Sequence, residues 1–248
     1  MGGSLGNAWI WWILSKTPLR DAKDPRFFGR RRGKALRRTG RTLVEELLPR
    51  LAIALPAPGT SIEPSVLFAQ RTSEIWLEVG FGGGEHLAWQ AIHNPDVGLI
   101  GSEVFVNGIA SLLGHIQRDD IKNVRIYPED VRHLFPVLPD ACLNRVFVLF
   151  PDPWPKKRHA ERRFVGAGNL DNLSRLLVDG GQLRIATDDD VYKAWACARM
   201  AEHADFEDIT ADPLVKTEDW PATRYEAKAR AAGREPIFLR YRRRPRQL

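Results

Sequence analysis

The chain has 248 residues, enough for one large domain or two small ones. Hydrophobic residues make up 44% of it and charged residues 27%, which is typical of a soluble globular protein. The two cysteines, Cys142 and Cys197, form no CxxC motif, so a disulfide framework and the usual zinc and redox motifs are excluded.

The net charge of +6 is distributed unevenly along the chain. Residues 20–41 contain ten Lys or Arg residues but only two Asp, and residues 240–246 contain five more Arg. Basic surfaces on an otherwise nearly neutral protein indicate a polyanionic partner, most simply a nucleic acid. For residues 20–41 the alternative is a solvated tail.

The apolar segment AWIWWIL, residues 8–14, is the first hydrophobic run in the chain. It is far shorter than the roughly 20 residues that a membrane-spanning helix needs. No basic residue precedes it and no small-residue cleavage site follows it, so a signal peptide is not expected either. We therefore predict no membrane association.

From residue 74 onward, short apolar segments alternate with longer amphipathic ones, which predicts strands alternating with helices. This order is typical of an α/β fold with a doubly wound, mostly parallel sheet covered on both faces. We expect this domain to span residues 62–248, after an N-terminal extension (residues 1–61) that holds the basic arm and one helix near residues 42–53. The expected strands are residues 74–80, 97–104, 123–130, 145–152 and 182–188, with 206–210 and 237–244 able to complete the sheet; the expected helices are 84–94, 105–119, 169–181 and 190–204.

Ligands of such a sheet bind outside the carboxyl ends of its parallel strands. One strand ends in the glycine turn EVGFGGGEH, residues 78–86, and four others end in acidic residues. The glycines allow a tight turn and a close approach of a ligand to the backbone. Their spacing is G-x-G-x-G, not the G-x-G-x-x-G of dinucleotide sites, so the turn alone is a weak indication of a cofactor. The residues at these strand ends are Gly80, Gly82, Gly84, Glu103, Asp130, Asp152 and Asp188.

The acids suggest which ligand this edge of the sheet binds. Glu103 follows the turn by about the 20 residues expected of an acid that binds ribose hydroxyls. Glu78 would repel a pyrophosphate but would suit a cationic ligand such as S-adenosylmethionine, and Asp130 could accept a hydrogen bond from an adenine amino group. Taken singly, Glu103 and Asp130 could also be ordinary helix N-caps or loop acids.

Six motifs, EVGFGGGEH, GSEVF, YPEDV, FPDPWPKKRHAERR, RIATD and TRYE, occur in an order and spacing that resemble bacterial tRNA (guanine-N7-)-methyltransferases. The resemblance implies a cytoplasmic enzyme with a Rossmann-like, seven-stranded class I methyltransferase sheet. It implies methyl transfer from S-adenosylmethionine to a guanine in the tRNA variable loop. The family usually has T-K-[FY]-E where this chain has Arg224 in place of the Lys, which keeps the charge but changes the donor geometry. The implied donor residues are Glu78, Glu103, Asp130 and Asp152, beside the glycine turn, and the implied substrate residues are Lys156, Asp188, Thr223, Arg224, Tyr225 and Glu226.

The stretch FPDPWPKKRHAERR, residues 150–163, carries the chemistry in this interpretation. Guanine N7 has a lone pair and needs no deprotonation, so methyl transfer can depend on alignment rather than on a strong base. We therefore predict Asp152 to be the catalytic residue in an orienting and electrostatic role. The neighbouring prolines restrict its backbone, and Trp154 could either stack on a base or pack under the loop. The basic residues after it would contact phosphates, although Arg162 and Arg163 could also form a solvated helix face.

Three other functions remain possible from the residues alone. An amino-methyltransferase would have [DN]-P-P-[FYW] where this chain has DPWP. A nicotinamide-dependent oxidoreductase would have G-x-G-x-x-G and an active-site His or Tyr/Lys pair. A non-catalytic RNA-binding protein would need only the basic segments. The sequence indicates no metal and leaves a monomer and a homodimer equally open.

Overall fold

The computed structural model describes residues 29–247. The apolar segment at residues 8–14 and the basic residues before residue 29 lie outside this range. Within it, no helix combines the length and the apolar composition that a membrane crossing requires.

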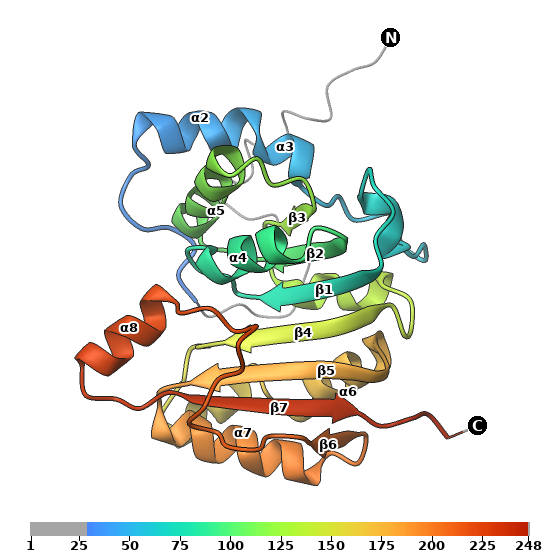
Figure 1. Cartoon of the computed structure of the whole chain (residues 1–248), viewed down its shortest axis with the longest axis vertical. Coiled ribbons are helices and arrows are strands. Elements are labelled where there is room, and N and C mark those ends of the chain that lie inside the picture. The colour runs from blue at the N-terminus through green and yellow to red at the C-terminus, as the bar shows by residue number, and fades with distance from the viewer. Residues whose placement is uncertain (1–28, 248) are drawn as a thin grey trace.

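The centre of the fold is a seven-stranded sheet with the order β3-β2-β1-β4-β5-β7-β6 (Figure 1). All neighbouring strands are parallel except β7, which runs antiparallel to both β5 and β6. The predicted doubly wound, mostly parallel α/β fold is therefore confirmed. The strands are β1 (Glu74–Val79), β2 (Val97–Ser102), β3 (Val124–Tyr127), β4 (Leu143–Leu149), β5 (Leu177–Thr187), β6 (Phe206–Asp208) and β7 (Ile237–Arg243).

The helices connect these strands and cover the sheet (Figure 1). Three differ from the prediction. The single helix expected near residues 42–53 begins at Arg38 and is divided at Leu47 into two helices. The helix expected at residues 169–181 ends at Leu176, because β5 begins immediately at Leu177. Residues 224–231, for which we predicted no helix, form α8. The helices are α2 (Arg38–Glu46), α3 (Leu48–Leu51), α4 (Glu85–His93), α5 (Val106–Arg118), α6 (Ala167–Leu176), α7 (Asp190–Glu202) and α8 (Arg224–Ala231), with short 3-10 turns at Pro64–Leu67, Val131–His133, Phe135–Val137 and Lys157–Arg162.

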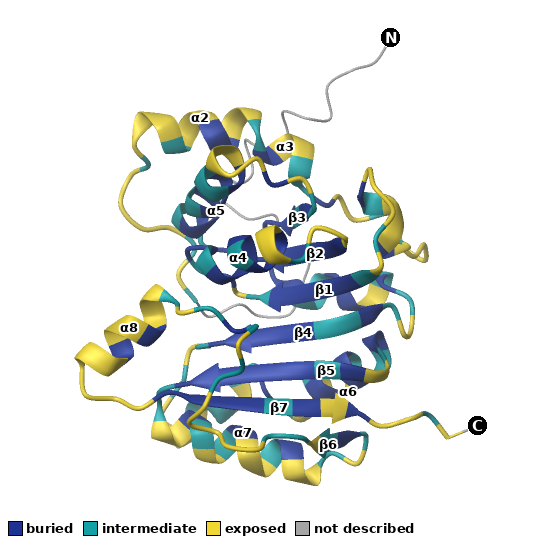
Figure 2. Cartoon of the chain, viewed as in Figure 1, coloured by how far each residue is buried: buried dark blue, intermediate teal, exposed yellow. Residues whose placement is uncertain are grey.

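Two clusters of buried side chains form the core, one on each face of the sheet. Along β4, Val146 and Val148 belong to one cluster while Phe147 and Leu149 belong to the other. Successive side chains of a strand point to opposite faces, so this alternation separates the two layers. The central strands are buried almost throughout, whereas most of α8 is exposed (Figure 2). A strand buried on both faces explains the continuous apolar run in the sequence.

The described part of the basic arm lies against the body of the protein. The Val106 amide donates to the Arg31 carbonyl oxygen (3.0 Å), and the Gly33 amide donates to the Asn107 side chain (2.8 Å). Further along, Leu43 and Val44 of α2 are buried in the same cluster as the central strands. Helix α2 thus adds apolar surface to the core beside the sheet. The predicted division between an N-terminal extension (residues 1–61) and a methyltransferase-type domain (residues 62–248) stays a prediction.

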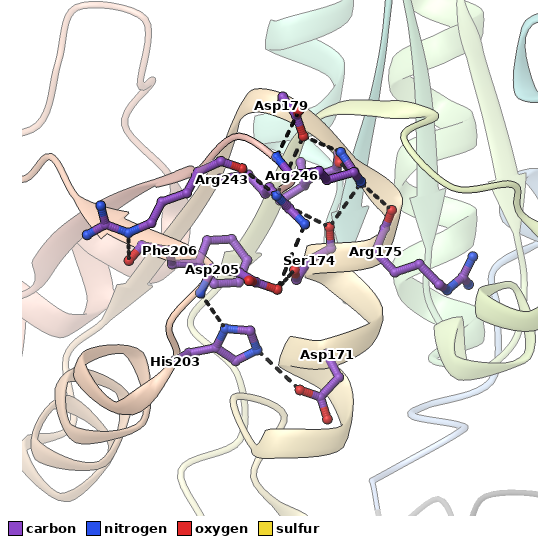
Figure 3. Close-up of polar contacts among 11 residues, drawn as sticks. Asp171, Ser174, Arg175, Asp179, His203, Asp205, Phe206, Arg243 and Arg246 are labelled. Atoms are coloured by element: carbon purple, nitrogen blue, oxygen red, sulfur yellow. Dashed lines mark hydrogen bonds and ion pairs between the residues drawn. The ribbon is translucent and has the colours of Figure 1, made fainter. Parts of the chain in front are cut away.

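The C-terminal arginines are used in a way that the charge pattern did not predict (Figure 3). Arg243 is only 7% exposed, and its Nε donates to the Ser174 carbonyl oxygen at 3.2 Å. The Arg246 guanidinium donates to the carbonyl oxygens of Arg175 and Leu177, each at 2.8 Å, which caps the end of α6. Arg246 also pairs with Asp179. These two arginines therefore stabilise the fold instead of forming a free basic surface.

Candidate active site

A pocket of about 440 Å³ opens at the carboxyl ends of β1 to β4, beside the start of α8. Its size is typical of sites for small molecules. Eight of the thirteen residues predicted for the site line it: Glu78, Gly80, Gly82, Glu103, Asp130, Asp152, Thr223 and Tyr225. The other five lie outside its lining: Gly84, Lys156, Asp188, Arg224 and Glu226.

The glycine turn between β1 and α4 forms one wall of the pocket. Gly80, Gly82 and Gly84 have φ angles of 65°, 55° and 80°, a region that favours glycine. Gly84 is the N-cap of α4, and a Cβ added there would lie 2.7 Å from the Cβ of Leu112. Gly84 therefore gives the turn its shape without lining the pocket.

Glu78 enters the pocket from the end of β1 and is only 2% exposed. Its Oε2 lies 2.7 Å from Nδ1 of His86, which is 3% exposed and also lines the pocket. The sequence motifs did not single out His86, although its place in the first turn of the helix after the glycine turn puts it near β1. A buried carboxylate is stable only with hydrogen-bond partners, and His86 is one for Glu78.

Glu103 is held by backbone amides at the point where β2 leads to α5. Its Oε1 accepts hydrogen bonds from Val104 N and Phe105 N, and its Oε2 accepts one from Gly82 N, all at 2.8 Å. Burial raises the pKa of the carboxyl group, and the three backbone hydrogen bonds oppose that increase. Because a carboxylate oxygen has two lone pairs, Oε2 can still accept one bond from a ligand. Part of the alternative interpretation therefore holds as well, since Glu103 also satisfies amides at the start of α5.

Asp130 follows β3 and is 7% exposed. Arg132 Nη2 lies 2.5 Å from its Oδ2, and Arg132 N and Nε each lie 3.0 Å from its Oδ1. The preceding residue, Glu129, pairs with Arg31 of the basic arm at 2.6 Å. Gly29 and Arg30 also line the pocket, so the arm forms part of its wall. The contact of Asp130 with an adenine stays a prediction.

Asp152 lies in a constrained loop at the rim of the pocket. Phe150 and Trp154, two residues before and after it, have φ angles of 50° and 41°, which non-glycine residues rarely adopt. Each such conformation costs on the order of 1–3 kcal/mol and persists only where its surroundings enforce it. Asp152 itself is exposed, and its carboxylate has no hydrogen bond or ion pair within residues 29–247. The loop thus holds a carboxylate available to a ligand.

Arg163 is one of the residues that enforce this loop conformation. It is 7% exposed, and its guanidinium donates to the carbonyl oxygens of Pro153 and Trp154 at 3.0 Å. The same guanidinium lies over the ring of Trp195 in α7, with its Cζ 4.8 Å from the ring centroid. The solvated helix face considered for Arg163 is therefore wrong, and its phosphate contact stays a prediction that would compete with these hydrogen bonds. A buried arginine within a basic run leaves no sign in the charge pattern.

The ring of Trp154 is partly packed, with Arg162 over it at 5.0 Å and His159 edge-on at 5.8 Å. Lys156, Lys157 and Arg158 are exposed beside it, outside the pocket. The phosphate contacts proposed for this basic run stay predictions for these three residues and for Arg162.

The TRYE motif forms the start of α8. Thr223 is the N-cap, and its hydroxyl accepts a hydrogen bond from Glu226 N at 3.2 Å. The ring of Tyr225 stacks on Phe150 (centroids 6.3 Å apart) and covers Gly82, where an added Cβ would lie 3.1 Å from it. Burial raises the pKa of Tyr225, and the nearby Glu103 adds to that increase. Thr223 and Tyr225 thus close one side of the pocket.

The remaining predicted substrate residues have partners in the protein. Glu226 is buried and pairs with Lys216 (2.9 Å) and Arg230 (3.2 Å). Arg224 Nη2 lies 2.8 Å from an oxygen of Glu85, in the first turn of α4. Asp188 pairs with Arg234 at 2.6 Å. Their contacts with a substrate stay predictions, since each would compete with these pairs.

The sheet, the glycine turn and the acids at successive strand ends define the class of the protein, a methyltransferase with the Rossmann-like class I fold. A family model described as "Putative methyltransferase" matches residues 72–239. One solved structure, a 16S rRNA (adenine(1408)-N(1))-methyltransferase from Catenulisporales acidiphilia, has the same fold, with a TM-score of 0.50 at 15% identity over 71% of this chain and 90% of that one. Within residues 29–247, no three His, Cys, Asp or Glu side chains gather closely enough to hold a metal ion.

Curated relatives define the family more narrowly. A tRNA (guanine-N(7)-)-methyltransferase of Paramagnetospirillum magneticum is 59% identical over 91% of this chain and 95% of its own length. One from Rhodospirillum rubrum is 49% identical over 92% of each chain. The chain belongs to the tRNA (guanine-N7-)-methyltransferase family.

Proposed function

We propose that this protein transfers a methyl group from S-adenosylmethionine to N7 of a guanine in the variable loop of tRNA. Its family supports the reaction and the class of substrate. The observation that carries the proposal is the position of Asp152, an unpaired carboxylate between an acid-lined pocket and the exposed basic residues 156–158. A cationic donor suits the first surface, and an RNA backbone suits the second.

The pocket fits the proposed donor in size and chemistry. When bound, S-adenosylmethionine supplies an electrophilic sulfonium methyl group. Glu78 and the glycine turn would receive its ammonium end, because Glu78 is a carboxylate fixed from behind by His86. Glu103 would accept a bond from a ribose hydroxyl through the free position on Oε2, and Asp130 would accept one from the adenine amino group.

Asp152 would act on the guanine. Its two oxygens can accept hydrogen bonds from guanine N1–H and the 2-amino group, which would orient N7 toward the pocket. Methylation makes the purine cationic, so a fixed carboxylate also stabilises the charge that develops. No proton needs to leave N7, and the pocket therefore needs no general base. Lys156 and its basic neighbours would hold the RNA backbone in place.

The test is nucleoside mass spectrometry of tRNA incubated with the protein and S-adenosylmethionine. We expect 7-methylguanosine, and tRNA in which the variable-loop guanosine is replaced by adenosine should remain unmodified. Products methylated on an exocyclic amine or on oxygen would reject the assignment of Asp152. Failure to bind the donor at all would reject the enzyme and leave an RNA-binding protein.

A further inference from the structure

A chain of buried hydrogen bonds leads from Glu78 to a distant part of the sequence. Gln90, one turn after His86 on α4, is fully buried. Its Nε2 lies 3.2 Å from Nε2 of His86 and 2.7 Å from the carbonyl oxygen of Asp219. Glu78 at the donor pocket is thereby connected through two side chains to the backbone at Asp219.

The direction of each hydrogen bond follows from the chemistry of the groups. The Asp219 carbonyl can only accept, so the Gln90 atom beside it must be the amide nitrogen. That nitrogen can only donate, so His86 Nε2 accepts, and the imidazole proton lies on Nδ1. His86 Nδ1–H then donates to Glu78 Oε2. Each member of the chain has one arrangement that satisfies all of its neighbours.

Asp219 belongs to the crossing segment, residues 209–223, which links β6 to α8 across one face of the sheet (Figure 1). Its carboxylate accepts hydrogen bonds from Arg184 (2.8 Å) and Arg145 (3.2 Å), on β5 and β4. The next residue, Trp220, is 2% exposed and packs edge-on against Phe238. Asp219 therefore fixes the crossing segment both to β4 and β5 and to α4.

The crossing segment ends at Thr223, which lines the pocket together with Tyr225 in the first turn of α8. The crossing segment and the start of α8 thus contact the donor pocket twice, through Tyr225 over Gly82 and through the Asp219–Gln90–His86–Glu78 chain. A shift of Glu78 would strain or break buried hydrogen bonds that also fix the start of α8. Leaving a buried polar group unpaired is unfavourable, so the two movements are energetically linked.

We propose that His86 and Gln90 are positioning residues that couple donor binding at Glu78 to the placement of the crossing segment, and hence to tRNA binding. This inference rests on the proposed function, because it takes Thr223 and the first residues of α8, residues 224–226, as tRNA contacts. Coupling between two sites is reciprocal: donor bound at Glu78 raises the affinity for tRNA by the factor by which tRNA raises the affinity for donor.

The test measures that factor directly. The Kd of S-adenosylhomocysteine is determined by calorimetry with and without a saturating tRNA transcript, for the wild type and three variants. His86→Asn keeps an N–H near the Nδ1 position for Glu78 but removes the acceptor for Gln90. Gln90→Leu removes the link from the other side. His93→Asn is the matched control, since His93 is exposed on the same helix, where its Nδ1 lies 2.8 Å from the carbonyl oxygen of Trp89 and its ring stacks on that residue.

We expect tRNA to tighten binding of S-adenosylhomocysteine to the wild type and to His93→Asn by at least about five-fold, the lower end of typical coupling. In His86→Asn and Gln90→Leu the ratio of the two Kd values, without and with tRNA, should fall to near one, whatever change the substitutions make in the affinity for S-adenosylhomocysteine alone. If His86 and Gln90 had a merely structural role, their substitution would lower the stability of the protein and its affinity for S-adenosylhomocysteine equally with and without tRNA. The ratio of the two Kd values would then not change. If Gln90→Leu fails to fold, His86→Asn decides the question.

Two results would overturn the inference. The first is that the wild type binds both ligands but has the same Kd for S-adenosylhomocysteine with and without tRNA, because there would be no coupling to transmit. The second is a ratio in His86→Asn equal to that of the wild type. Failure of the wild type to bind S-adenosylhomocysteine or tRNA at all would instead reject the proposed function, so the two failures are distinguishable.

Discussion

Replacing Asp152 with Asn removes the charge at the rim of the pocket and preserves the shape of the side chain. The wild-type carboxylate is exposed and unpaired within the described chain, so the folded state loses no contact. We expect the free energy of unfolding to change by less than about 0.5 kcal/mol, as for other surface substitutions. Loss of one preorganised electrostatic group typically lowers kcat by about 10²–10³, or roughly 3–4 kcal/mol of transition-state stabilisation.

The assay is single-turnover methylation of a tRNA transcript at saturating S-adenosylmethionine, combined with thermal unfolding and tRNA binding. Glu161→Gln is the matched control, because Glu161 is another exposed carboxylate that lines the same pocket. It removes an equal charge and should lower the rate far less. Affinity for tRNA should change little in either variant, since contacts to phosphates lie elsewhere.

Either of two results would refute the orienting and electrostatic role of Asp152. An equal loss of rate in Glu161→Gln would show that only the total charge of the pocket matters. A marked solvent deuterium isotope effect on the wild-type chemical step, absent from Asp152→Asn, would show that Asp152 accepts a proton in the transition state. We expect an isotope effect near one, because guanine N7 has no proton to lose.

Three further predictions concern separate parts of the structure. Lys156→Ala should weaken tRNA binding and reduce the slope of log K against log salt by about 1, whereas an unchanged slope would mean no phosphate contact. Gly108→Ala should destabilise the protein by about 1–3 kcal/mol and weaken donor binding, because the added Cβ would lie 2.2 Å from the Gly82 carbonyl oxygen. The control is Gly114→Ala on the same helix, where the added Cβ meets open space and should stabilise α5 by up to about 1 kcal/mol. Burial alone would raise the Asp219 pKa, but hydrogen bonds from its partners lower it to about 2, so its stabilising effect is complete above about pH 4 and disappears as pH falls toward 2. The free energies of unfolding of the wild type and Asp219→Asn, measured by chemical denaturation, should therefore differ by about 1 kcal/mol at pH 7 and converge near pH 2. This difference is smaller than the lowered pKa alone would imply, because the side chain is 45% exposed.

The sequence predicted the strands well where apolar runs are bounded by glycine or acidic residues, as at residues 74–80 and 97–104. It failed at residues 169–181, because the apolar residues that end α6 are followed directly by those that begin β5. A helix and a buried strand in succession produce one continuous apolar pattern, and only the tertiary structure divides it. Gly180 and Gly181, the last two residues of the predicted helix, lie within β5, where Gly180 has a φ of 81°.

Helix α8 was missed although a local signal was present. Thr223 and Glu226 fit the S/T-x-x-E pattern that marks a helix N-terminus, and the Thr223 hydroxyl does accept from Glu226 N. The helix has only two buried residues, Glu226 and Ala229, so its hydrophobic period is too weak to detect. Its position beside the pocket depends on the crossing segment, whose path across the sheet has no sequence signature.

The glycines of the turn contact other parts of the protein as well as the pocket, which distinguishes the turn from a simple dinucleotide fingerprint. Gly82 lies under the ring of Tyr225, donates its amide to Glu103, and presents its carbonyl oxygen to the helix at Gly108. Gly84, the third glycine, gives room to Leu112 of the same helix, α5. Gly82 and Gly84 are thus required by contacts from α8 and α5, in addition to any ligand, whereas Gly80 is required by its φ of 65°. The turn is a junction of three distant parts of the chain, so substitutions there should disturb the donor pocket and the start of α8 together.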